Sequence, residues 1–263
     1  RRSDVMKLTA ETYQAIDEFR HERFFKRGVD LLISNYPKIV QERKITSDVL
    51  RIAVKKSLIW VTEKGFSSPL LAMRMTCAQL CFGSFFMEDP RYAVLKDIIE
   101  EHISTHEIND EDHIHDYIVA NQADWQTDWF TEHLPLTWKL CAARNVIPHT
   151  APEWPTAGGI FQQLFDVERR SSFLLSENTR QAIFQQLMKS ASVAVTTGGD
   201  EQIQLLLAIA QYYDGFRCFD DPLRPRWYGM LAPENRPHLP WRLQELFTPG
   251  KQQDKHDEQS RST

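Results

Sequence analysis

The sequence predicts an all-α protein, a multi-helix bundle built from two related helical units. Apolar residues recur at helical spacing along most of the chain, and no stretch shows the sustained apolar/polar alternation of a strand. A pattern of helices and turns in residues 48–91 also recurs in residues 180–223. Hydrophobic residues make up 42% and charged residues 25%, with 10 glycines, which excludes a mainly disordered or fibrous protein.

The first two helices are expected before residue 65. Thr9 can cap a helix that continues towards Tyr36, and Pro37 ends it. Ser47 or Asp48 can cap the second helix. Its apolar residues fall at i, i+4, i+8 and i+11, which is one face of a helix: Leu50, Val54, Leu58 and Val61.

Further helices are expected from Ser67 to Ala143. Ser67 or Ser68 opens a third helix, and Pro90 lies in the first turn of a fourth. Helical segments then follow near Asp110–Gln122 and Asp124–Ala143.

An internal repeat relates two parts of this helical pattern. Asp48–Arg91 falls on Arg180–Leu223 without a gap when the chain is shifted so that Asp48 meets Arg180. Both copies predict an amphipathic helix, a short turn, an apolar helix and a turn containing glycine and an aromatic residue. Identities are sparse, so chance similarity between two helical hairpins is the alternative to duplication. The matched residues are Val61/Val193, Ala78-Gln79/Ala210-Gln211, Gly83/Gly215 and Asp89-Pro90/Asp221-Pro222.

Four regions follow from these patterns. Residues 1–104 are the first helical unit, and residues 105–156 are an acidic helical segment followed by a proline-rich connector. Residues 157–247 are the second helical unit, with Leu239–Phe247 as its last short helix. Residues 248–263 are polar and are expected to be a disordered tail.

Charge is segregated along the chain. Residues 97–138 contain eleven acids and neither Lys nor Arg, a formal charge of −11, whereas the whole chain carries −5. Such a segment repels nucleic acid and anionic membranes and attracts a basic partner. The alternative is a solvated acidic face without a partner. The acids are Asp97, Glu100, Glu101, Glu107, Asp110, Glu111, Asp112, Asp116, Asp124, Asp128 and Glu132.

Aromatic residues within the acidic segment indicate a protein interface. Trp125 and Trp129 are one helical turn apart, and large aromatic side chains next to carboxylates suit binding to Lys or Arg of a partner. The alternative is that both tryptophans are core residues of this helix. The predicted partner-binding residues are Asp124, Trp125, Asp128, Trp129, Phe130, Asp110, Glu111 and Asp112.

A metal site is the competing hypothesis. His102 and His106 are at i, i+4, and His115-Asp116 resembles the motif of the HD phosphohydrolases, which are all-helical metalloenzymes. That resemblance is two residues long and implies a metal-dependent hydrolase. The protein-interface hypothesis, by contrast, predicts a non-enzymatic binding module that needs neither a cofactor nor a catalytic residue. The four cysteines, at 77, 81, 141 and 218, are too few for a disulfide scaffold and favour the reducing cytoplasm.

A second resemblance concerns roughly residues 19–99. This region resembles small helical proteins of unassigned role encoded beside the spike and effector genes of bacterial type VI secretion systems. The resemblance implies an immunity protein or an effector-loading adaptor, and it transfers no catalytic residues to this chain. An immunity protein that neutralises a basic toxin would suit the acidic segment. The resemblance is carried by Asn35-Tyr36-Pro37, Trp60-Val61, Gly65-Phe66, Cys81-Phe82-Gly83, Phe86 and Asp89-Pro90-Arg91-Tyr92.

Overall fold

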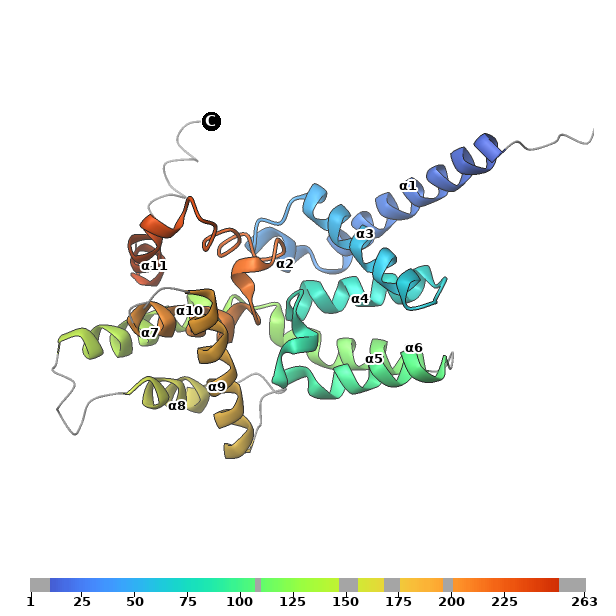
Figure 1. The fold of residues 1–263 in the computed structure, drawn as a ribbon. Coiled ribbons are helices and arrows are strands. Elements are labelled where there is room, and N and C mark those ends of the chain that lie inside the picture. The colour runs from blue at the N-terminus through green and yellow to red at the C-terminus, as the bar shows by residue number, and fades with distance from the viewer. Residues whose placement is uncertain (1–9, 107–109, 147–155, 168–175, 196–200, 251–263) are drawn as a thin grey trace, which may run out of the picture. The chain divides into compact units, whose positions relative to one another are not determined.

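The all-α prediction is confirmed by a computed structural model of the chain (Figure 1). The structure describes residues 10–106, 110–146, 156–167, 176–195 and 201–250. Within these ranges every regular element is an α-helix or a short 3₁₀ helix. The proline-rich connector and the C-terminal tail expected from the sequence lie outside the described residues, apart from the residues up to Gly250.

The chain divides into two compact units, residues 1–77 and 78–263. The division falls within one helix, α4 (Pro69–Phe82), whose last turn belongs to the second unit. The sequence instead placed the first boundary after residue 104. The difference arises because the segment after α4 contacts residues more than a hundred positions later in the chain: Ser84, for example, donates hydrogen bonds to Asp221.

The first unit is built on a long helix, α1 (Ala10–Asn35), which packs along α3 (Ser47–Glu63). Pro37 ends α1 as expected and opens the short α2 (Pro37–Glu42). The hydroxyl that caps α3 belongs to Thr46, which accepts from the Val49 amide at 3.3 Å. This corrects the cap expected at Ser47 or Asp48: these two residues are already helical, and Asp48 instead lies in the first turn.

The second unit surrounds one buried helix, α10 (Glu201–Asp214), in which every residue from Leu205 to Asp214 is buried. A helix that is buried on all sides is stable only when other helices cover it. The helices α7 (Trp129–Val146), α9 (Glu177–Ala194) and α11 (Leu239–Phe247) and the 3₁₀ turn η5 (Cys218–Asp220) contact α10, and two phenylalanine rings of α8 (Ala157–Val167) pack on Tyr212. The other elements of the unit are α5 (Ala93–Thr105), α6 (Asp110–Asn121) and the 3₁₀ turns η1 (Phe86–Glu88), η2 (Pro90–Tyr92), η3 (Gln122–Trp125) and η6 (Arg236–His238).

Two expectations about helix ends can be compared directly with this unit. The predicted last helix, Leu239–Phe247, has the bounds of α11. Pro90 does not lie in the first turn of α5, as expected, but opens the separate turn η2, after which α5 begins at Ala93.

Candidate protein-binding surface

The acidic segment forms a helical hairpin on the second unit. Helices α5 and α6 pack against each other and bury apolar residues of both, including Leu95, Ile99, Ile114 and Ile118. Their other faces are exposed and carry carboxylates. The described acids that are exposed on the two helices are Asp97, Glu100, Glu101, Asp112 and Asp116, and we call these five residues the acidic face.

Local helix energetics account for only part of the acidic face, because Asp112 lies in the first turn of α6, where the helix dipole favours a carboxylate, whereas the other four acids lie further along their helices. Asp97 and Glu101 are at i, i+4, as are Asp112 and Asp116, so each pair lies on adjacent turns. Like charges at this spacing destabilise a helix by about 0.2–0.5 kcal/mol per pair. Glu100, which belongs to neither of these pairs, has a cation beside it, since Lys96 Nζ lies 3.7 Å from its carboxylate. The carboxylates therefore concentrate negative charge at a small cost in stability.

The structure corrects the aromatic part of the predicted interface. Trp125 is 1% exposed and packs against the rings of Phe82 and Tyr92, with centroids 6.1 and 5.9 Å apart. Phe130 is fully buried and packs edge-to-face against Trp227 at 5.0 Å. Both side chains therefore belong to the core, as the alternative interpretation of the tryptophans expected for Trp125, and neither is available to a partner.

Trp129 has an intermediate position. Its side chain is half-buried, stacks on the His133 ring at 5.4 Å, and donates its indole N–H to the Asp124 carbonyl oxygen. Asp124 is also half-buried. These contacts hold the tryptophan against its own helix, α7, and against the preceding turn η3, and they leave only part of its surface to solvent.

Asp128 is held within the protein. Its carboxylate caps α7 by accepting from the Thr131 amide at 3.2 Å, and it forms an ion pair with Arg226. Arg226 also lies 4.9 Å from the centre of the Phe130 ring. Burial by itself would raise the pKa of the Asp128 carboxyl, but the Arg226 guanidinium and the Thr131 donors hold that pKa below its usual value. Asp128 is thus ionised and paired with an arginine of the same chain, which it shares with Asp214, 3.3 Å from Arg226.

Of the eight residues predicted from the sequence, Asp112 is the one that the structure places on the exposed acidic face. Asp110 and Glu111 begin α6, but their side chains lie outside the described residues. Sequence reasoning missed Arg226 as the partner of Asp128, because 98 residues separate the two and no local pattern connects them.

The candidate metal ligands occupy separate positions. His102 is buried on α5, and His106 ends that helix in a left-handed conformation with φ 57°. His115 and Asp116 are exposed on α6. The described part of the chain contains no group of three or more His, Cys, Asp or Glu side chains that could hold a metal ion.

A groove in the first unit is a surface that the sequence analysis did not identify. It lies between α1 and the start of α3 and has a volume of about 650 Å³. Phe19, Val29 and Ile33 give it apolar walls, and Phe19 is 67% exposed. The ion pair between Arg51 and Glu22, at 2.6 Å, borders it.

Comparison with known proteins identifies no relative. The chain matches no protein-family model, no curated protein and no solved structure. Among the described residues, no helix combines the length and the apolar character needed to cross a bilayer.

Proposed function

We propose that this chain is a non-enzymatic protein-binding module, and specifically an immunity protein that neutralises a basic toxin of a type VI secretion system. The observation that carries the proposal is the acidic face of α5 and α6, where exposed carboxylates lie on successive turns. The resemblance of residues 19–99 to helical proteins encoded beside type VI effector genes supports the choice of partner.

The acidic face would act mainly on association. Carboxylates on an exposed surface attract a cationic protein from solution and accelerate the encounter, and this effect weakens as salt screens it. Binding across the toxin's cationic site would then occlude it. Trp125, Phe130 and Asp128 hold the second unit together in this proposal and do not contact the toxin.

The first experiment is an affinity pull-down from the native host with the full chain, followed by mass spectrometry. The proposal expects one stoichiometric basic partner encoded near this gene. Co-expression with that partner then separates the two roles suggested by the sequence. Rescue from toxicity supports an immunity protein, whereas a partner that stays active in the complex and also binds a secretion spike supports an effector-loading adaptor.

Charge reversal then tests the surface itself. The D97K/E101K variant should slow association about tenfold at low salt and flatten its salt dependence. The matched control is E42K/E63K, which makes the same change in net charge at exposed positions of the first unit. Equal affinities for the two variants would contradict the assignment of the acidic face.

A further inference from the structure

Two turns of the second unit have similar backbone conformations in the register of the sequence repeat, which places residue 83 on residue 215, but they differ at the equivalent residues Phe85, with φ −105°, and Arg217, with φ 52°. The first turn, residues 83–92, follows α4, and the second turn, residues 215–224, follows α10. Each begins with a glycine at positive φ, +101° for Gly83 and +107° for Gly215. Each then forms a 3₁₀ helix, η1 over residues 86–88 and η5 over residues 218–220, so the two 3₁₀ helices occupy equivalent positions in this register.

The hydrogen bonds of the two turns also correspond. In both turns, the glycine amide donates to the carbonyl four residues earlier, and the glycine carbonyl accepts from the amide three residues later. The amide of an aspartate donates to the carbonyl three residues before it, and the carboxylate of that aspartate accepts from the amide two residues after it. The equivalent pairs are Gly83→Gln79 and Gly215→Gln211, Phe86→Gly83 and Cys218→Gly215, Asp89→Phe86 and Asp221→Cys218, and Arg91→Asp89 and Leu223→Asp221.

The same register extends to the helices before the turns. Helix α4 spans residues 69–82 and α10 spans residues 201–214, so both of their bounds are equivalent. The last residues of α1 and α8, at positions 35 and 167, are equivalent as well. Leu32 and Leu164, which match in this register, are both buried. The corresponding bounds of α3 and α9 agree only to within two residues.

The two turns contact each other as a twofold axis requires. In a twofold pair, a residue touches its own equivalent only where the axis passes. Gly83 and Gly215 are equivalent, and a Cβ on Gly83 would lie 3.6 Å from Gly215 Cα. Phe85 and Arg217 are also equivalent, and the Arg217 guanidinium lies 4.1 Å from the centre of the Phe85 ring.

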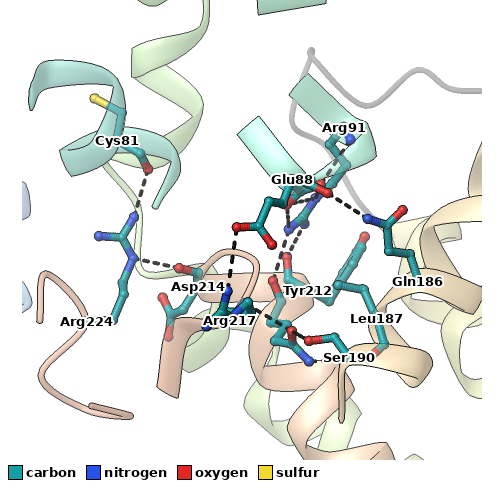
Figure 2. Close-up of polar contacts among 12 residues, drawn as sticks. Cys81, Glu88, Arg91, Gln186, Leu187, Ser190, Tyr212, Asp214, Arg217 and Arg224 are labelled. Carbon is teal, nitrogen blue, oxygen red and sulfur yellow. Dashed lines mark hydrogen bonds and ion pairs between the residues drawn. The ribbon is translucent and has the colours of Figure 1, made fainter. Parts of the chain in front are cut away.

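Each turn also sends an arginine to the helix end of the other (Figure 2). Arg91, in the first turn, donates to the carbonyls of Gln211 and Tyr212 at 3.0 and 2.5 Å. Arg224, in the second turn, donates to the carbonyl of Cys81 at 3.2 Å. These carbonyls lie in the last turns of α10 and α4, where helix carbonyls can accept from groups outside the helix, and the Gln211 carbonyl also accepts from the Gly215 amide. The two arginines are one position apart in the register.

We infer that residues 69–92 and 201–224 are two copies of one helix–turn unit, and that their turns, residues 83–92 and 215–224, pair with each other about a local twofold axis within the second unit. The exchanged arginines and the self-equivalent contacts make this pairing an isologous interface within one chain. The inference is independent of the proposed function, since none of these residues belongs to the acidic face.

Exchanging two equivalent residues across the axis tests the symmetry. Arg217 pairs with Asp220 of its own turn and lies 3.6 Å from Glu88 of the other. Residues 88 and 220 are themselves equivalent. In the F85R/R217F variant the guanidinium at position 85 would therefore lie near the same two acids, Glu88 and Asp220, and near the phenylalanine ring at position 217. The F85R/R217F variant should therefore recover the contact that F85R and R217F each lose.

The readout is the folded-to-unfolded ratio from urea denaturation of the full chain. The ratio for F85R/R217F should exceed the value expected from adding the two single-variant effects by about tenfold. The single variant R217F is the control for the backbone cost of phenylalanine at this position, where φ is 52°, because the double variant bears the same cost. Additive effects, or a double variant that fails to fold although R217F folds, would overturn the twofold pairing.

A second cycle tests the exchanged arginines with conservative variants. The variants R91K and R224K keep the positive charge at each position but lose the planar set of guanidinium donors. The R91K/R224K variant should lose less stability than the two single variants together, because loosening one arginine already loosens the paired turns. In the control cycle, R224K combined with R51K, the effects should add, since Arg51 pairs with Glu22 in the first unit. Additive effects in both cycles would overturn the mutual dependence of the turns.

Discussion

Substituting alanine at Gly215 should be among the most destabilising small changes in this chain. Its φ of +107° is a conformation that residues with a Cβ adopt at a cost of about 1–2 kcal/mol. A Cβ there would also lie 2.9 Å from the Phe82 carbonyl oxygen, which is backbone and cannot turn away. Overpacking of this kind costs about 1–3 kcal/mol. The two effects together predict a loss of roughly 2–5 kcal/mol for G215A.

Two other glycines separate the backbone cost from the steric cost. Gly83 has a φ of +101°, but a Cβ there would lie at an ordinary contact distance of 3.6 Å, so G83A should lose about 1–2 kcal/mol. Gly229 has a φ of +73°, and a Cβ at this position would meet no atom within 4 Å, so G229A should lose about 1 kcal/mol. Urea denaturation followed by circular dichroism measures all three. Equal losses for G215A and G229A would refute the close approach of the two turns.

Three further predictions concern groups buried in the second unit. Because Arg226 lowers the pKa of Asp128, the ionised carboxylate stabilises the folded state above the unfolded-state pKa of about 3.9, and this stabilisation is lost as pH falls through the lower folded-state pKa. The difference in unfolding free energy between wild type and D128N should therefore disappear in acid, and a difference that does not change with pH would contradict the ion pair. Burial raises the pKa of the Cys218 thiol well above its usual value, so this thiol should resist a thiol reagent at pH 8 and react once urea unfolds the chain, as peptide mapping would show. Replacing Trp125 or Phe130 by alanine should cost about 3–5 kcal/mol in thermal or urea unfolding, and a loss below about 1 kcal/mol would place them outside the core.

Local patterns predicted most of the helices. Pro37 ends α1, the Ser68 hydroxyl accepts the Leu71 amide at the start of α4, and α11 spans the residues expected from its apolar spacing. These signals depend on neighbours within four residues, so they survive without tertiary information. Their precision is limited to a residue or two: the cap of α3 is Thr46, whereas Ser47 or Asp48 was expected, because three adjacent polar residues offer similar capping chemistry.

The candidate surface shows where local patterns fail. Trp125 and Trp129 have the same residue type and similar acidic neighbours, yet one is buried and the other half-buried. Trp125 is covered by Phe82 and Tyr92, which precede it by more than thirty positions. Asp128 likewise counted as a surface charge in the sequence, and in the fold it is half-buried and forms an ion pair with Arg226.

The sequence by itself determined the helical class, several helix ends, the segregation of negative charge on residues 97–138 and the register in which the two turns can be compared. These properties are periodic or compositional and can be detected along the chain. Only the tertiary structure decided which aromatic side chains are core, which acids stay exposed on α5 and α6, and that the two turns face each other through Gly83 and Gly215. Those outcomes depend on which distant segments cover one another, because burial and charge pairing are set by neighbours in space.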